Sequence, residues 1–126
     1  MATVQSEEEI RDLLTRLVGE KITGFQVLGI NSLKSLAPPP DAVVGEVVSA
    51  IEVAGRILRL QTIAVTVTVD LQRVGKLVWL KAAEPFRHSP GVPMPTVRLL
   101  LEGGAGLDLT EPAKTKRITV ALTAGS

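Results

Sequence analysis

The sequence predicts one mostly β domain with about eight antiparallel strands, arranged as a sandwich or a barrel. Three observations predict this class. The chain has 126 residues, the size of one ordinary domain, and contains no internal repeat or linker. From about residue 20 onward, apolar and polar residues alternate with a period of two, as they do in half-buried strands. The strand–helix–strand alternation of a parallel sheet is missing.

The first expected element is a helix that begins at a capping box. In Ser6-Glu7-Glu8-Glu9 the serine hydroxyl accepts from the backbone of Glu9, whose side chain reaches back. Apolar residues then recur at helical spacing, and they are Ile10, Leu13, Leu14, Leu17 and Val18. Gly19 is expected to end this helix.

The remaining elements are expected to be strands, turns and one short helix. The expected strands are residues 21–28, 47–53, 56–61, 62–70, 76–81, 97–101, 106–109 and 117–122. Pro38-Pro39-Pro40-Asp41 predicts a stiff turn that opens a short helix as far as residue 44. Residues 84–95 contain four prolines and predict a long exposed loop. Gly103-Gly104 predicts a hairpin turn.

The composition describes an ordinary globular chain with an aliphatic core. Hydrophobic residues make up 45% of the sequence and aromatic residues 2%, and the single tryptophan, Trp79, is expected in the core. There is no cysteine, which excludes disulfides, a thiolate nucleophile and cysteine-ligated metals in this chain. The sequence contains neither a signal peptide nor a run of about 20 apolar residues. We therefore expect a soluble cytoplasmic protein that makes no membrane contact.

No complete catalytic or metal site is visible in the sequence. His88, the only histidine, lies in the proline-rich loop and is expected to be solvated. One histidine and scattered carboxylates predict no metal site, and we expect no cofactor. Glycines 103, 104 and 106 lie between strands instead of before a helix, so they do not predict a phosphate-binding loop.

Positive charge concentrates in the second half of the chain. The net charge of +1 divides into −4 for residues 1–55 and +5 for residues 56–126. A phosphate-binding surface is predicted from six basic residues, and they are Arg56, Arg73, Lys76, Lys114, Lys116 and Arg117. The alternative is that these charges only occupy solvent-facing strand positions.

Four segments follow one another in the order of a known family's motifs. They are Leu17-Val18-Gly19-Glu20-Lys21-Ile22-Thr23-Gly24, Ala54-Gly55-Arg56-Ile57-Leu58, Val69-Asp70-Leu71-Gln72-Arg73-Val74-Gly75-Lys76-Leu77 and Leu109-Thr110-Glu111-Pro112-Ala113-Lys114-Thr115. In this order they resemble the N-terminal domain of the formamidopyrimidine-DNA glycosylase and endonuclease VIII family. The resemblance implies a two-sheet antiparallel β-sandwich with two flanking helices over residues 1–126. It also implies that the family's helix–two-turn–helix and zinc-finger domains are absent from this chain.

The resemblance implies a partner, damaged duplex DNA, but an altered site. In the family the amine of the N-terminal proline attacks the sugar, and the next residue in the sequence is a glutamate that serves as acid and base. Here Ala2 and Thr3 occupy these two positions. Arg56 corresponds to a phosphate-contacting lysine and Arg73 to a methionine wedge, while Asp70 replaces a histidine. The implied activity is therefore an impaired DNA glycosylase that binds the DNA backbone.

One chemical route remains open at the N-terminus. Removal of Met1 before the small Ala2 would expose a primary amine, whose pKa is ordinarily about 8. Such an amine forms a Schiff base with the aldehyde of an abasic site.

The sequence leaves open two alternatives to an impaired DNA glycosylase domain. One is an active subunit of a split DNA glycosylase and AP lyase, completed by a second polypeptide that carries the helix–two-turn–helix and zinc-finger half. The other is a β-sandwich interaction module with no DNA role. DNA binding would further imply a nucleoid association.

Overall fold

The computed structural model describes residues 5–29, 33, 39–73, 75–111 and 117–124. Within these residues it contains one α-helix, one 3-10 helix and eight strands. In chain order they are α1 (Glu7–Thr15), β1 (Ile22–Val27), η1 (Pro40–Val43), β2 (Ala50–Ala54), β3 (Ile57–Gln61), β4 (Val65–Asp70), β5 (Lys76–Leu80), β6 (Val97–Leu101), β7 (Gly106–Thr110) and β8 (Thr119–Ala124).

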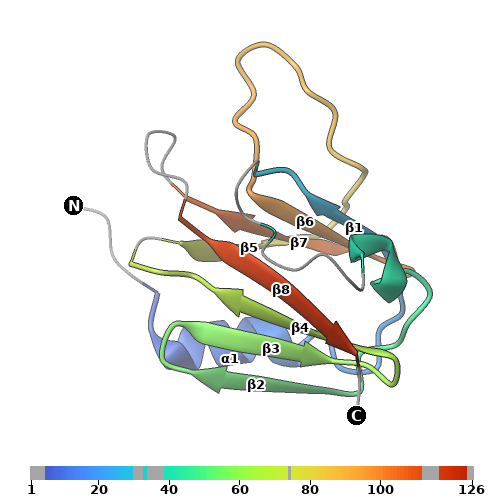
Figure 1. The fold of residues 1–126 in the computed structure, drawn as a ribbon. Helices are drawn as coiled ribbons and strands as arrows, with labels where there is room; N and C mark the ends of the chain where they lie inside the picture. The colour runs from blue at the N-terminus through green and yellow to red at the C-terminus, as the bar shows by residue number, and fades with distance from the viewer. Residues whose placement is uncertain (1–4, 30–32, 34–38, 74, 112–116, 125–126) are drawn as a thin grey trace.

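The strands form two four-stranded sheets that pack face to face (Figure 1). One sheet has the order β1-β6-β7-β5 and the other β2-β3-β4-β8, and every pairing is antiparallel. The predicted mostly β class and the two-sheet antiparallel sandwich are confirmed. The barrel, the other arrangement compatible with the strand pattern, does not form because the two sheets remain separate.

Short elements close the two open sides of the sandwich. Helix α1 packs against β2 and β5, the strands at matching edges of the two sheets. On the opposite side η1 packs against β1, and Leu33 bridges to Val120 of β8. Of the two expected flanking helices, only α1 is an α-helix in the described residues. The proline-led segment forms a single 3-10 turn instead, and the backbone is already extended at Val44 (φ −66°, ψ 127°), which leaves no room for a further helical turn.

Helix α1 begins as expected and ends early. Ser6 Oγ accepts from Glu9 N at 3.1 Å, and Ser6 N donates to the Glu9 carboxylate at 3.4 Å, which completes the capping box. The expected end at Gly19 is wrong by four residues, since α1 stops at Thr15. Leu17 N donates to Leu14 O at 2.9 Å, a tighter i to i−3 pattern that carries the chain to Gly19 with Leu17 still buried.

Three strands start later than expected, two because of side-chain hydrogen bonds and one because of backbone hydrogen bonds to another segment. Thr62 was expected in β4, but its hydroxyl accepts from Val65 N and donates to Val65 O, which makes a turn before the strand. Arg117 was expected in β8, yet its backbone N–H donates to the carboxylate of Glu111. Val48 was expected in β2, but it exchanges backbone hydrogen bonds with residues 19 and 20.

The core is aliphatic, as the composition indicates. Val65, Val67 and Val69 of β4 point inward and are buried, while Thr66 and Thr68 face outward, which confirms the predicted alternation. Trp79 is partly buried and packs against the edge of the core, so its expected place in the core is confirmed only in part. Its ring lies on the α1 side, with the Arg16 guanidinium 5.4 Å from the ring centroid.

The proline-rich residues 84–95 form an arm between β5 and β6 that rises from the sandwich (Figure 1). Val92 N donates to Ser89 O at 3.1 Å, and Gly91 has φ +79°, which is the geometry of a type II turn led by Pro90. His88 is exposed on this arm, as the sequence predicts. Among the described residues no helix is long and apolar enough to cross a membrane.

Gly75 allows the connection between β4 and β5 to pack closely. A Cβ at this position would lie 2.5 Å from Leu71 O and 2.9 Å from Ile118 Cδ1. We expect Gly75→Ala to lower the free energy of unfolding by about 2 kcal/mol, because the backbone oxygen cannot move aside cheaply. Urea denaturation followed by Trp79 fluorescence measures this loss. Gly103→Ala is the matched control, since its Cβ would meet only Glu20 Oε1 at 3.6 Å. Equal stability of the two variants would contradict the clash.

Candidate nucleic-acid interface

Three connections that are distant in sequence meet at one end of the sandwich. Asp70 pairs with Ile57 at the start of β3 and with Thr119 at the start of β8. Lys76 at the start of β5 pairs with Thr110 at the end of β7. The β2–β3 turn, the β4–β5 connection and the β7–β8 connection therefore lie side by side. We call the surface that they carry, with Arg73, Lys76 and Arg117, the basic end.

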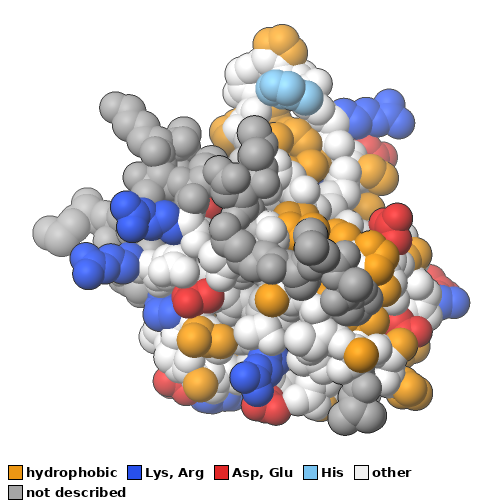
Figure 2. All heavy atoms as spheres, viewed as in Figure 1, with side chains coloured by type: hydrophobic (Ala, Val, Ile, Leu, Met, Phe, Trp, Pro, Cys, Tyr) orange, Lys and Arg blue, Asp and Glu red, His pale blue; other side chains and the backbone are white. Residues whose placement is uncertain are grey.

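Three cationic side chains at the basic end are exposed to solvent. Arg73, Lys76 and Arg117 are exposed, and none of them takes part in an ion pair with another described residue. Figure 2 shows Lys and Arg side chains gathered on the side of the molecule where Figure 1 places the β4–β5 and β7–β8 connections. The structure thus places Arg73, Lys76 and Arg117, three of the six residues of the predicted phosphate-binding surface, at the same end of the sandwich. Lys114, Lys116 and Ala2 lie outside the described residues.

Arg56, the expected phosphate contact, is turned inward. Its Nε donates to Gln72 O at 3.0 Å, its Nη1 donates to Gln5 O at 3.0 Å, and its Nη2 donates to Gly75 O. Three of the five guanidinium donors are thereby used on backbone carbonyls, and the side chain is half-buried. The geometry assigns Arg56 a cross-linking role at the basic end, and its contact with phosphate stays a prediction.

Two hydrogen bonds constrain the β4–β5 connection, which carries Arg73. Asp70 Oδ1 accepts from Gln72 N at 2.8 Å, and Gly75 N donates to Leu71 O at 3.1 Å. Gln72 has φ +58°, a left-handed conformation that a non-glycine residue adopts only when its surroundings hold it there. Arg73 follows Gln72, so the fold presents an exposed cation next to a residue whose backbone N–H is hydrogen-bonded.

Glu111 fastens the two ends of the β7–β8 connection together. Its carboxylate accepts from Arg117 N at 2.6 Å, from Ile118 N at 3.1 Å and from Thr96 Oγ1 at 2.7 Å. Sequence analysis assigned Glu111 only to a family-like motif, and the structure shows what its carboxylate does. The backbone of Arg117 is fixed in this way while its side chain remains exposed.

Gln5 was not singled out by the sequence analysis, and it anchors the start of the chain at this end. Its Oε1 accepts from Leu77 N at 2.7 Å, and its Nε2 donates to Leu77 O at 2.9 Å. A neighbouring strand would use these same two groups of Leu77. A glutamine before a helix cap has no sequence signature for such a contact, so only the fold reveals it.

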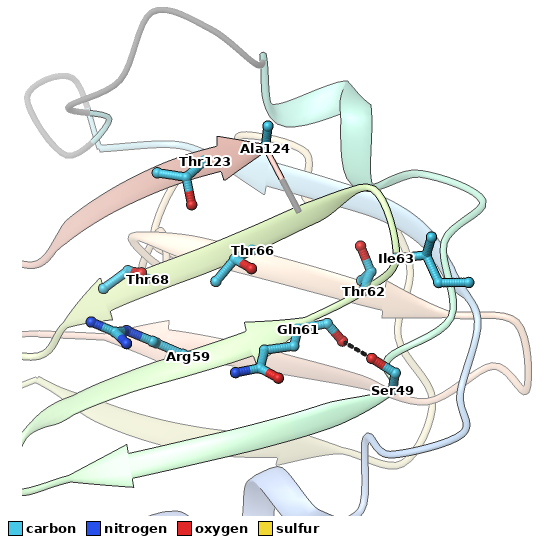
Figure 3. A pocket seen from close by; sticks show the side chains of 9 residues that line it. All are labelled: Ser49, Arg59, Gln61, Thr62, Ile63, Thr66, Thr68, Thr123 and Ala124. Atoms are coloured by element: carbon cyan, nitrogen blue, oxygen red, sulfur yellow. Dashed lines mark hydrogen bonds between the residues drawn. The ribbon is translucent and has the colours of Figure 1, made fainter. Parts of the chain in front are cut away.

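The outer face of the β2-β3-β4-β8 sheet carries a polar hollow of about 670 Å³ (Figure 3). It is lined by Ser49, Arg59, Gln61, Thr62, Ile63, Thr66, Thr68, Thr123 and Ala124. Arg59 is its one charged lining residue among those described, and hydroxyl and amide groups supply the rest of its polarity. Among the described lining residues there is no acid–base pair.

The outer face of the other sheet carries an ion pair between a buried aspartate and a partly buried arginine. Arg98 of β6 binds Asp108 of β7 with two parallel hydrogen bonds, Nε to Oδ1 at 2.8 Å and Nη2 to Oδ2 at 2.9 Å. The hydrogen bond to Asp108 raises the pKa of Arg98 above its ordinary value, so the guanidinium stays charged. Arg98 also donates to Glu84 O at 3.0 Å and lies over the Phe86 ring, which fastens the base of the arm. The pair is structural.

No group of three or more metal-binding side chains occurs among the described residues.

Comparison with known proteins adds a structural likeness and no sequence match. No protein-family model and no curated protein matches the chain. The chain superposes on a Lactococcus lactis Fpg (MutM) in complex with FAPY-dG-containing DNA, with a TM-score of 0.70 and 17% identity over 90% of this chain and 41% of that one. A MutM bound to carbocyclic 8-oxo-G DNA gives a TM-score of 0.70, with 17% identity over 90% of this chain and 40% of that one.

The chain has a DNA glycosylase-like fold. A Lactococcus lactis Fpg with the substitution G226P gives a TM-score of 0.73, with 17% identity over 94% of this chain and 42% of that one. The resemblance predicted from the sequence is therefore confirmed for the fold. The chain spans about two fifths of the length of the solved structures that it matches.

Proposed function

We propose that this chain is a DNA-binding domain that holds the backbone of damaged duplex DNA at its basic end. The observation that carries the proposal is that Arg73, Lys76 and Arg117 lie at one end of the sandwich, exposed and without an ion pair to any described residue. Free cations on an ordered backbone are suited to phosphate contacts, each of which releases counterions. The glycosylase-like fold, seen in proteins that were solved with damaged DNA, supports the same reading.

The proposed domain is impaired in glycosylase chemistry. Ala2 and Thr3 stand where the resembled family has its proline and glutamate, so the family's nucleophile and acid–base group are both replaced. The described residues bring no other nucleophile and base together at the basic end. We further propose that residues 1–126 act as one domain in the cytoplasm, associated with the nucleoid through DNA.

Salt dependence of DNA binding tests the proposal. Fluorescence anisotropy would compare an undamaged duplex with one that contains a tetrahydrofuran abasic analogue, from about 50 to about 200 mM salt. Three phosphate contacts predict that the logarithm of the affinity falls against the logarithm of salt with a slope of about −2.7. Binding that salt leaves unchanged, or an absence of binding, would overturn the DNA role and favour an interaction module.

A second candidate activity is Schiff-base formation by the Ala2 amine, and the Gln5 anchor favours it. The anchored Gln5 lies at the basic end, and Ala2 precedes it by three residues. The neutral amine adds to the C1′ aldehyde of an abasic site, and loss of one water leaves an imine. Borohydride reduces that imine to a stable secondary amine.

The expected result is a covalent protein–DNA adduct at the N-terminal peptide, identified by mass spectrometry after borohydride trapping. An adduct at a lysine would assign the chemistry to another amine. Trapping only after a second polypeptide is added would instead favour the split glycosylase.

A further inference from the structure

We propose that the arm of residues 84–95 is a second DNA-contacting element, whose tip enters the minor groove of the duplex that the basic end holds. The inference rests on the DNA binding proposed above and adds a contact that the basic end does not make. The arm connects β5 to β6 and rises from the sandwich, and Figure 2 shows apolar side chains at its free end.

The end of the arm is fastened to the basic end through a single carboxylate. Thr96, the residue after the arm, is 1% exposed, and its Oγ1 donates to Glu111 Oε2 at 2.7 Å. Oε1 of the same carboxylate accepts from Arg117 N at 2.6 Å. Thr96 N also donates to Leu109 O at 2.8 Å, near the end of β7 that leads to Glu111. The arm and Arg117 therefore begin at neighbouring points at the same end of the sandwich.

The start of the arm is held by side chains of the sheet beside it. Gln26 of β1 accepts from Phe86 N at 2.7 Å and donates to Phe86 O at 3.4 Å. The Arg98 guanidinium donates to Glu84 O at 3.0 Å. Because both ends are fixed and four residues of the arm are prolines, the arm loses little conformational entropy when it meets a ligand.

The exposed part of the arm is cationic and apolar. Residues 87–94 are all exposed, and Val92 is 50% and Met94 39% exposed. Arg87 supplies a positive charge, and no acidic residue occurs at positions 85–101. Proteins that bind the minor groove combine arginine with apolar side chains such as methionine and proline, and a narrow minor groove attracts arginine by its negative potential. Readout in the major groove depends on hydrogen bonds to base edges, for which valine and proline have no side-chain groups.

The arm is long enough to reach the floor of a groove. The turn at its tip is closed by Val92 N, which donates to Ser89 O at 3.1 Å. Residues 87–91 span at most about 17 Å, since an extended chain advances about 3.3–3.6 Å per residue. The minor groove is about 7.5 Å deep. The tip therefore reaches the bases without drawing the basic end away from the phosphates.

Removing the apolar side chains of the arm tests the proposal. Val92→Ser/Met94→Ser is expected to weaken binding to an A·T-rich duplex with a tetrahydrofuran abasic analogue about tenfold, measured by fluorescence anisotropy at about 50 mM salt. The salt slope should stay at its wild-type value, since no charge is removed. Both residues are exposed, so an unchanged urea midpoint is expected as well.

Two exposed valines far from the arm provide the matched control. Val44 and Val47 are 45% and 47% exposed and lie on the connection from η1 to β2. Gly45 N, between them, donates to Ile22 O at 2.7 Å, at the opposite end of β1 from the arm. Val44→Ser/Val47→Ser is expected to leave the affinity for the duplex unchanged.

The charge of the arm is tested by a second pair of variants. Arg87→Ala is expected to make the salt slope shallower by about 0.9, the effect of one lost contact with the DNA charge. Lys81→Ala removes the same charge from an exposed residue just after β5 and is expected to keep the wild-type slope.

Competition with groove-binding drugs identifies the groove. Netropsin occupies the minor groove of A·T-rich DNA, whereas methyl green occupies the major groove. Saturating netropsin is expected to remove the tenfold difference in affinity between the wild type and Val92→Ser/Met94→Ser, and saturating methyl green to leave it intact.

The results separate the arm from the basic end. Wild-type affinity in Val92→Ser/Met94→Ser, or an equal loss in Val44→Ser/Val47→Ser, overturns the role of the arm, while DNA binding by the basic end stands. A difference that methyl green removes and netropsin leaves intact overturns the minor-groove contact. A wild-type protein that shows no salt-dependent binding to DNA overturns the proposed function, and the role of the arm with it.

Discussion

Asp108→Ala is expected to lower the free energy of unfolding by about 3 kcal/mol, because it leaves the largely covered charge of Arg98 without its partner. Asp108 is 6% exposed, and the Arg98 side chain is 19% exposed. Alanine removes both carboxylate oxygens that Arg98 binds, yet Arg98 remains between β6, Phe86 and the Glu84 carbonyl. Urea denaturation followed by Trp79 fluorescence measures the change as a lower midpoint at constant slope.

The pair of Glu52 and Arg59 provides the control for this prediction. These residues are also directly opposite each other on adjacent antiparallel strands, but their side chains are 59% and 52% exposed and 4.0 Å apart. Glu52→Ala is expected to change stability by about 0.5 kcal/mol or less, as exposed pairs generally do. A double-mutant cycle on Arg98 and Asp108 isolates their coupling. A loss in Asp108→Ala no larger than that in Glu52→Ala would show that burial does not strengthen this pair.

Local patterns in the sequence predicted most of the fold. The capping box at Ser6 and the inward valines of β4 depend on residues close together in the chain, and both are confirmed. The hairpin at Gly103-Gly104 likewise depends on local turn chemistry, and it joins β6 to β7. The predictions that failed concern features determined by contacts between residues far apart in the sequence. Thr119 became the start of β8 because Glu111 takes the preceding N–H groups, and no local propensity encodes that competition.

The candidate site could be predicted only in part. Arg73 and Lys76 were found because the motif order placed them beside one strand, and the fold leaves both exposed. Arg56 occupies the expected loop, but its guanidinium turns toward three carbonyls that become neighbours only when two sheets and the N-terminal segment meet. Gln5 has no local signature at all. The register of Arg98 with Asp108 was missed as well, because a two-residue turn at Gly103-Gly104 would pair Arg98 with Leu109.

Removing the three free cations of the basic end is expected to weaken DNA binding by roughly a hundredfold at low salt. In the triple variant Arg73→Ala/Lys76→Ala/Arg117→Ala the salt slope is expected to become shallower by about 2.7, since each lost phosphate contact removes about 0.9. The substitutions leave the backbone hydrogen bonds of Gly75 and Arg117 in place, so folding should be preserved. Anisotropy titrations at several salt concentrations measure both effects.

The control variant must remove the same charge from other surfaces. Lys21→Ala/Arg59→Ala/Lys81→Ala does so, because these exposed residues lie at the start of β1, on the outer sheet face and just after β5. Both triple variants change the net charge from +1 to −2, so general attraction to DNA falls equally. Retention of the wild-type salt slope by the control alone would locate the phosphate contacts at the basic end. An equal loss of affinity in both variants would mean that binding depends only on the net charge of the protein. The position of Arg73, Lys76 and Arg117 would then have no role in binding.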